Sequence, residues 1–306
     1  MKTRILILYL FVIISNYSKA QQFNNSSLSL FNHYLQNPAS AGSKPYFFVS
    51  ASYSKYWSGI NGSPEFQNLS AHSLMKDKMA FGVNLTNENT GLAGKSGAEF
   101  SYAYHLPITE NGTKLSFGLS ALVNQYKLFK DKLIMDDPSD EAVVNSENNI
   151  IIPDAAFGLS LYNDNKYFVD LSVYQLFGSN AGFRNNKTID NKQVRHYFLR
   201  AGYQFTISEL FNIEPSVSYK TTESMVNQIE IGLKTIIKKS LALGCLYRTH
   251  DAIVPFIGFD AKNAMFAYSY GIIMGSVGNY TSGTHEIMLI LKINQAKSSI
   301  NNSSNK

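Results

Sequence analysis

The chain has 306 residues and a formal net charge of +5, with 44% hydrophobic and 13% aromatic residues. Lys2, Arg4 and Lys19 all fall within residues 1–20, so the rest of the chain carries 24 basic against 22 acidic side chains, a net charge of +2. This balance gives no sign of polyanion binding. The single cysteine, Cys245, excludes an internal disulfide.

Residues 1–20 have the features of a secretory signal peptide. Lys2 and Arg4 supply the positive region, residues 5–14 form an apolar run, and Ser18-Lys19-Ala20 is a small-x-small cleavage site. The apolar run is shorter than the roughly 20 residues of a transmembrane helix, and no later stretch is long enough. Residue 21 is Gln rather than Cys, so a lipidated N-terminus is not indicated. An exported chain of this kind is periplasmic, secreted or an outer-membrane barrel.

Residues 21–45 do not resemble a strand. Leu28, Phe31 and Leu35 have helical spacing and precede Asn37-Pro38, which would end a short helix. We expect this segment to form a plug, or a lid at the periplasmic mouth of a barrel.

From residue 46 onward the chain alternates apolar and polar residues with a period of two. In residues 264–274, Phe266, Tyr268 and Tyr270 share one face, whereas Met265 and Ser269 lie opposite. The broad apolar face is typical of strands turned toward lipid, and the pattern predicts an all-β fold, an antiparallel transmembrane outer-membrane barrel of about 14 strands over residues 46–294. The tail 295–306 is polar, as in disordered segments. The predicted strands are 46–56, 65–74, 78–86, 95–107, 113–128, 153–162, 166–176, 193–205, 211–220, 226–237, 240–249, 253–261, 264–274 and 284–294.

The connections between these runs alternate in length. With both termini in the periplasm, the odd-numbered connections are extracellular, and these are the long ones in outer-membrane barrels. A soluble sandwich would have no reason to sort its loops in this way. The long odd connections are 57–64, 87–94, 129–152, 177–192 and 275–283, whereas the even ones are tight.

Charged side chains on the inward faces carry both signs. They could line a water-filled pore or pair across a plugged lumen, and the mixture of signs favours pairing over a ring of one charge. The inward set is Asp170, Arg200, Glu214, Lys220, Glu230, Lys234, Arg248, Asp260 and Lys292.

No catalytic, metal or cofactor site is predicted. The six histidines show no ligand spacing, and the sequence has neither a nucleophile elbow nor a glycine-rich phosphate loop. A Ser/His hydrolase at one rim stays open as an alternative, because triads assemble from distant positions. The longest outer connection is acidic, which predicts a solvated loop or a partner-docking surface, with a calcium site as an alternative. The candidate docking residues are Asp131, Asp136, Asp137, Asp140 and Glu141.

Several stretches, in order and over nearly the whole chain after residue 20, resemble the type IX secretion system membrane proteins of the PorP/SprF family. The first is residues 34–42, with an Asn-Pro-Ala-x-Ala-Gly signature, and the second is residues 53–64, with a Trp-x-Gly-x-x-Gly-x-Pro element. Residues 100–105, 157–162, 169–172, 247–252 and 283–287 fit later sections. The sequence departs from the family at Lys55, Tyr56 and Asp170. The residues that carry the family motifs are Asn37, Pro38, Ala39, Gly42, Trp57, Gly59, Gly62, Pro64, Gly91, Tyr104, Arg248, Tyr268 and Glu286.

This resemblance implies a non-enzymatic outer-membrane protein of Bacteroidota, with no cofactor. Its partner would be a secreted surface protein, such as a gliding adhesin, whose C-terminal signal domain docks on loops 129–152 and 177–192. Alternatively, the barrel would couple the outer membrane to the periplasmic secretion machinery through its N-terminal segment and short turns. A passive porin-like channel is the competing function, because barrels host either role.

Overall fold

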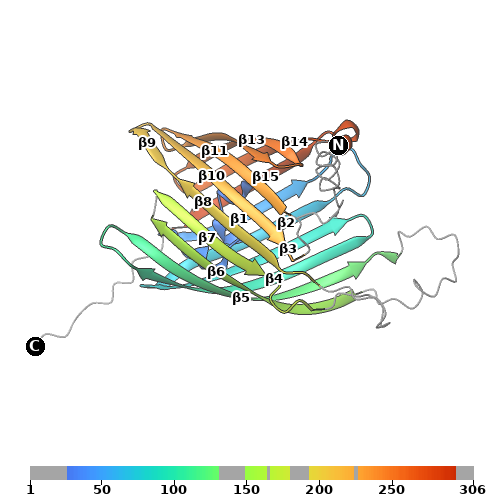
Figure 1. Cartoon of the computed structure of the whole chain (residues 1–306), viewed down its shortest axis with the longest axis horizontal. Helices are drawn as coiled ribbons and strands as arrows, with labels where there is room; N and C mark the ends of the chain where they lie inside the picture. Colours follow the sequence, from blue (N-terminus) through green and yellow to red (C-terminus); the bar gives the residue numbers. More distant parts are fainter. Residues whose placement is uncertain (1–25, 131–148, 164–165, 180–192, 224–226, 294–306) are drawn as a thin grey trace, which may run out of the picture.

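The computed structural model describes residues 26–130, 149–163, 166–179, 193–223 and 227–293, which form one antiparallel β-barrel (Figure 1). Each strand pairs with its neighbours along the chain. The strands are β1 (Phe47–Lys55), β2 (Glu65–Lys76), β3 (Met79–Thr90), β4 (Ala93–Pro107), β5 (Thr113–Leu128), β6 (Asn149–Asn163), β7 (Tyr167–Tyr174), β8 (His196–Tyr203), β9 (Phe205–Ser208), β10 (Phe211–Thr222), β11 (Asn227–Ile237), β12 (Leu241–Arg248), β13 (Ala252–Ala261), β14 (Ala264–Ile273) and β15 (Thr284–Ile293).

The barrel closes because the last strand pairs with the first. β15 and β1 are in register from Phe47↔Ile293 to Lys55↔His285. β9 continues β8 beyond Gln204 and pairs with the same neighbour, β10, so the barrel has 14 strands, as predicted. Closure leaves no unpaired edge, which is the condition for strands to span lipid. None of the described helices is long and apolar enough to cross a membrane.

The two ends of the barrel differ in their connections. One end, called the outer end, carries connections 56–64, 129–148, 175–195 and 274–283. At the other, the inner end, the strand connections that the structure describes are short turns such as 77–78 and 262–263. The prediction of a long loop at residues 87–94 is wrong, since β3 and β4 stay paired up to Thr90↔Ala93. Gly91, with a φ of +57°, permits the tight turn that replaces this loop.

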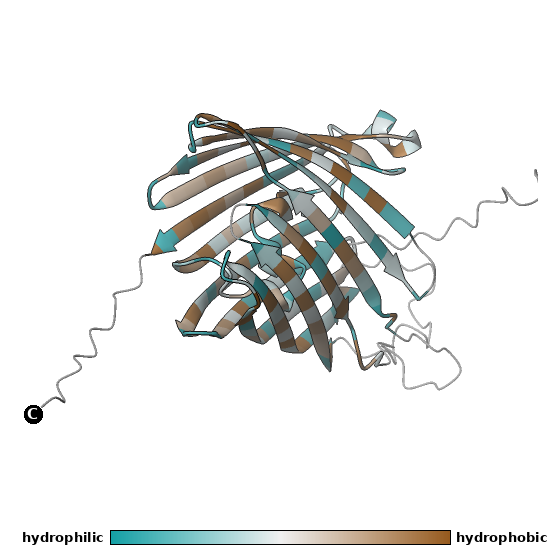
Figure 2. Cartoon of the chain, turned by 60° about the vertical axis from the view of Figure 1, so that its left-hand side comes forward, coloured by the Kyte–Doolittle hydropathy of each residue, from teal (hydrophilic) through white to brown (hydrophobic). Residues whose placement is uncertain are grey.

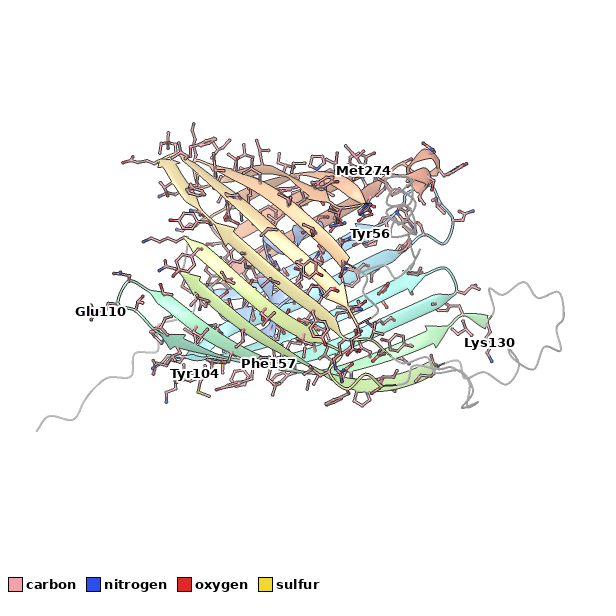
Figure 3. The ribbon with its side chains drawn as sticks, in the orientation of Figure 1. Tyr56, Tyr104, Glu110, Lys130, Phe157 and Met274 are labelled. Atoms are coloured by element: carbon pink, nitrogen blue, oxygen red, sulfur yellow. The ribbon has the colours of Figure 1, made fainter. Side chains whose placement is uncertain are left out.

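The outward face of the wall is apolar. Phe100 is 54% exposed and Leu119 is 57% exposed, whereas the alternate residues Ser101 and Ser120 are buried inside. Hydrophobic and hydrophilic bands consequently alternate along the strands (Figure 2). Figure 3 shows the side chains of Tyr104 and Phe157 pointing away from the barrel, as lipid-facing residues do.

The inner face is divided into two sectors, one apolar and one polar. On β12 to β15 and β1, apolar side chains such as Val254, Phe256 and Ile290 point inward and pack around the buried Leu28. The remaining wall is lined mainly by serine, asparagine and charged side chains. The apolar sector exists because it packs against the N-terminal segment rather than facing water.

Residues 26–43, called the plug, lie inside the barrel, where Figure 2 shows their coiled ribbon within the ring of strands. The plug is a series of short 3-10 helices, η1 (Ser27–Leu30), η2 (His33–Leu35) and η3 (Pro38–Ser40), rather than one helix. It is also not a lid at the inner mouth. Ser27 contacts Glu286 and Arg248 near the outer end, whereas Gly42 lies against Leu74 and Ala80 beside the β2–β3 turn, so the plug runs along the lumen.

Candidate functional site

The outer end of the plug is bound by two side chains from the family motifs. The Glu286 carboxylate accepts hydrogen bonds from Ser26 Oγ at 2.9 Å and from the Ser27 amide at 3.0 and 3.1 Å. Arg248 Nη2 donates to Ser27 Oγ at 2.9 Å. Glu286 belongs to the start of β15 and Arg248 ends β12, so both lie at the outer end. Burial raises the pKa of the neighbouring Tyr56, and the charge of Glu286 adds to this rise.

A row of four charged residues and one serine, paired in register on neighbouring strands, crosses the inner wall next to the contacts of Glu286 and Arg248 with the plug. Asp170, Arg200, Ser218, Glu230 and Arg248 are successive partners on β7, β8, β10, β11 and β12. Arg248 Nε donates to the Glu230 carboxylate at 2.9 Å.

Other inward charges also pair, as the mixed signs predicted. Lys220, fully buried, has its Nζ 3.9 Å from Glu230. Nearer the inner end, Lys234 lies 2.7 Å from Glu214, and Lys292 lies 2.5 Å from Asp260. These charges neutralise one another within the wall, so they do not form the single-sign ring of an ion-selective pore.

The middle of the plug binds the polar sector. Asn32 Nδ2 donates to Ser50 Oγ and Ser70 Oγ, each at 2.9 Å, and the Tyr34 hydroxyl bonds Ser101 Oγ at 2.8 Å. Burial raises the pKa of Tyr34, so its hydroxyl keeps its proton.

Glu99, which sequence reasoning missed, extends this network. Its carboxylate is buried and accepts hydrogen bonds from Ser120 at 2.7 Å, Ser101 at 3.3 Å and Asn84 at 3.3 Å. Its inward position could have been found from the alternation of residues 95–107, because it shares a face with Ser101 and lies opposite Phe100.

The Asn-Pro-Ala motif fits a recess in the wall. Asn37 Oδ1 accepts from the Ala39 amide at 2.9 Å and its Nδ2 donates to the Leu159 carbonyl at 2.8 Å, while Ser116 Oγ donates to the Ala39 carbonyl at 2.7 Å. Pro38 opens η3, a position where its missing N–H costs little.

Two glycines create that recess. A Cβ on Gly118 would lie 2.2 Å from the Ala39 nitrogen, and one on Gly158 would lie 2.0 Å from Asn37 Oδ1. Their missing side chains therefore give the plug its place against β5 and β6.

The inner end of the plug is held by two histidines. The Gly42 amide donates to His72 Nδ1 at 3.0 Å, and His105 Nε2 donates to the Ala41 carbonyl at 2.8 Å. Gly42 has a φ of +69°, and a Cβ there would lie 2.3 Å from that of Ala80, so only glycine fits.

Asp170, one departure from the family pattern, holds the plug from the side. Its carboxylate accepts from Ser160 Oγ at 2.6 Å, and its Oδ2 lies 3.5 Å from His33 Nδ1. Burial and the Arg200 guanidinium lower the pKa of His33 below its usual range, although Asp170 opposes this shift. His33 is therefore neutral near neutral pH.

The glycine and proline positions of the second motif shape the rim of the outer end. The Gly91 amide donates to the Gly62 carbonyl at 2.8 Å, and the Tyr56 amide donates to the Pro64 carbonyl at 2.9 Å. The Ser58 amide donates to the Gly283 carbonyl at 2.8 Å. Together these bonds join connections 56–64, 91–92 and 274–283 into one structure, called the outer collar, which also contains Trp57 and Gly59.

The remaining predicted residues lie apart from the lumen. Tyr104 is 37% exposed on the lipid face, and the Tyr268 hydroxyl bonds His285 Nδ1 at 2.8 Å on the outward side of β14 and β15. The acidic docking residues from Asp131 to Glu141 lie outside the described residues. Among the residues that the structure does describe, no three His, Cys, Asp or Glu side chains gather to hold a metal ion.

The site as a whole is a lumen occupied along its length by a segment of the same chain. Among solved structures, a FadL homologue from Pseudomonas aeruginosa shares the fold at 10% identity and a TM-score of 0.50, covering 90% of this chain and 95% of that one. The CymD monoaromatic hydrocarbon channel (11% identity, 89% and 94% covered, TM-score 0.49) and Omp33 of Acinetobacter baumannii (8%, 82% and 100%, 0.47) are more loosely similar.

No curated protein matches the sequence. The family model described as "Type IX secretion system membrane protein PorP/SprF" matches residues 18–291, nearly the whole chain and every motif placed above. The chain therefore belongs to the PorP/SprF family of type IX secretion system outer-membrane proteins.

Proposed function

We propose that this protein is a non-conducting docking barrel, which supports secretion and surface attachment of a partner protein by binding its type IX C-terminal signal domain. The observation that carries the proposal is the plug. It is hydrogen-bonded to β2, β4, β5, β6, β7, β12 and β15, and its apolar side chains pack against the wall. A lumen used in this way supports the shape of the barrel rather than the passage of solutes.

The outer end is the natural docking surface in this proposal. The outer collar fixes three connections in one structure, and a preorganised surface binds with less loss of conformational freedom than separate loops. The acidic residues Asp131, Asp136, Asp137, Asp140 and Glu141 belong to a longer connection at the same end. Their charge would favour a basic surface on the secreted partner.

The proposal is tested by purifying the tagged barrel from native outer membranes in mild detergent and identifying the proteins that accompany it. One large secreted protein in near-equal amount is the expected result. Recovery of periplasmic secretion components alone would instead favour a link to the machinery. A barrel that purifies alone and conducts ions in planar bilayers would contradict docking and favour a porin-like channel.

Two loop variants sharpen this test. Neutralising Asp131, Asp136, Asp137, Asp140 and Glu141, five of the six acidic side chains of connection 129–148, to Asn and Gln is expected to reduce the secreted protein held at the cell surface. The matched control neutralises Glu110 and Glu209, which lie in turns at the inner end, and should leave surface retention unchanged. Retention that survives neutralisation, and also survives removal of residues 132–147, would refute docking through this connection.

A further inference from the structure

A cavity of about 260 Å³ lies inside the barrel on the side of the outer end. Its described wall comes from β2 to β5, from β7 and β8, and from the end of η2 in the plug. Lys95 stands two residues after the start of β4, Tyr174 is the last residue of β7 and His196 is the first of β8, so the cavity lies near the outer connections. We call this cavity the outer chamber.

The size of the outer chamber suits a small ligand. One buried water needs a cavity of only about 10–15 Å³, so the chamber is far larger than the site of a single ordered water. It is slightly smaller than the pockets of about 300–1,000 Å³ that hold drug-sized molecules. A ligand of one or two small rings therefore matches this space.

Amide and hydroxyl side chains supply most of the hydrogen-bonding groups of the outer chamber. Each amide offers a donor and an acceptor, and each hydroxyl can act as either. Two of these groups converge above Gly97, since Thr86 Oγ1 and Asn124 Oδ1 would each lie 2.7 Å from a Cβ placed there. This lining matches a ligand whose own groups are neutral and act as both donor and acceptor. The amide residues are Gln36, Asn84, Asn124 and Gln175, and the hydroxyl residues are Thr86 and Tyr174.

Two polar atoms of the lining residues are buried without a hydrogen-bond partner in the described part of the chain. They are the Tyr174 hydroxyl and Gln175 Oε1, from consecutive residues at the end of β7. Gln175 also has a φ of +60°, in the left-handed region that residues other than glycine rarely adopt. Burying a polar group without a partner is unfavourable, so a ligand that pairs with these two atoms is favoured.

Aromatic rings line the same chamber. The Tyr174 and Phe198 rings meet edge to face, with centroids 5.8 Å apart and an interplanar angle of 85°, and Phe66 of β2 adds a third ring. Fixed rings offer flat apolar surface, and the Tyr174 hydroxyl adds a polar group at the edge of one ring. The ligand should therefore carry an apolar face as well as neutral polar groups.

The charges of the described lining do not favour an ionic ligand. Glu88 and Lys95, which have opposite signs, are partners in register on β3 and β4. The Glu99 carboxylate already accepts three hydrogen bonds from side chains of the wall. The chamber therefore lacks the ring of a single sign that selects ions, and a neutral ligand suits it better.

We propose that the outer chamber binds a neutral saccharide. A sugar ring combines hydroxyls, each a donor and an acceptor, with apolar C–H faces that pack against aromatic rings. An extended polypeptide fits less well, because strand pairing uses the backbone groups of the wall and leaves no strand edge for it. This inference goes beyond the docking function and does not depend on it, since the chamber lies inside the barrel rather than on the outer collar.

The test measures saccharide binding to the full-length barrel, purified in a detergent without a sugar headgroup, by saturation-transfer NMR. The probes are methyl glucoside, methyl galactoside, methyl mannoside and N-acetylglucosamine, compared with glycerol, glucuronate and glucosamine. We expect saturable binding of at least one neutral probe, with the strongest transfer to its ring C–H protons. Glycerol, which has hydroxyls but no ring face, and the two charged sugars should bind at least about tenfold more weakly.

Two variants test the chamber itself. Tyr174→Phe removes only the hydroxyl, Asn124→Leu replaces the amide by an apolar side chain of similar size, and each should weaken binding about tenfold. Because the Tyr174 hydroxyl has no hydrogen-bond partner among the described residues, its loss should leave the urea midpoint unchanged or slightly higher. The matched control is Tyr167→Phe, which removes a hydroxyl that bonds Thr113 Oγ1 at the other end of β7, and it should leave the affinity unchanged.

Barrel purified from native outer membranes shows where the saccharide comes from. Mass spectrometry after unfolding distinguishes a free saccharide, a glycolipid headgroup and a glycan of the secreted protein. Each of these supports the proposal if its amount falls in the Tyr174→Phe barrel. The proposal is overturned if none of the four neutral probes saturates and no saccharide in the native preparation depends on Tyr174. Equal affinities of the Tyr174→Phe and Tyr167→Phe barrels would overturn it as well.

Discussion

Replacing Gly118 by alanine tests whether the plug is held by the shape of the wall. The new methyl carbon would lie 2.2 Å from the Ala39 nitrogen and 2.4 Å from the Pro38 carbonyl carbon, whereas ordinary contact begins at 3.4 Å. Ordinary contact would therefore require the plug backbone to move away from Gly118 by about 1.2 Å, the difference between 3.4 and 2.2 Å. β5 itself has no need to move, because the clash is with the plug rather than with neighbouring strands.

That displacement separates the partners of two hydrogen bonds, Ser116 Oγ to the Ala39 carbonyl at 2.7 Å and Asn37 Nδ2 to the Leu159 carbonyl at 2.8 Å. Two such bonds contribute about 1 kcal/mol each, and groups left buried without partners add to the cost, so the free energy of plug docking should fall by about 2–4 kcal/mol. The population with an undocked plug would rise by roughly 30- to 1,000-fold.

Two measurements follow this population, single-channel conductance in planar bilayers and hydrogen exchange of the amides of residues 37–42. Gly118→Ala should show open events and faster exchange. The control is Gly97→Ala, whose methyl group would meet only the ends of the Asn124 and Thr86 side chains, which can rotate away. If Gly118→Ala keeps the conductance and exchange rates of the unmodified protein, the recess does not hold the plug.

Two further predictions concern buried charge and pH. Glu230→Gln removes the carboxylate that faces both Arg248 at 2.9 Å and Lys220 at 3.9 Å, and should lower the free energy of unfolding by about 3 kcal/mol, whereas Glu65→Gln, which breaks the more exposed pair with Lys55, should cost less than about 1 kcal/mol. Urea unfolding in micelles, followed by the fluorescence of Trp57, measures both, and equal losses would contradict this account. The pKa of His33 in the folded protein lies below the ordinary value of 6.5, so the docked plug favours neutral His33. The stability that neutral His33 gives to the docked plug is therefore complete above pH 6.5 and is lost as the pH falls from there through the folded pKa. Conductance should therefore be higher at about pH 5 than at about pH 8, and a pH dependence unchanged in His33→Gln would refute this role.

The barrel could be predicted from the sequence because strand patterns are local. In residues 264–274 the side chains alternate between lipid and interior. The sequence alone therefore assigns Phe266 to the outward face and Ser269 to the inward face, without knowledge of the neighbouring strands. The predicted ends of this strand and of β5 agree with the structure to within a residue. The loop predicted at 87–94 failed because Asn87 and Glu88 are polar yet still paired with β4, where polarity reflects position at the outer end rather than a loop.

The candidate site depended on contacts that no local pattern contains. The sequence by itself determined that inward charges of both signs exist and that an Asn-Pro-Ala segment precedes the first strand. Only the tertiary structure decided that Ser27 meets both Arg248 and Glu286, residues more than two hundred positions away, and that Gly118 and Gly158 are small to admit Asn37 and Ala39. It also turned the apolar inner face of β12 to β15 into a binding surface for Leu28. Alternation states which face of a strand a residue occupies, but closing the sheet around the plug decides what that face meets.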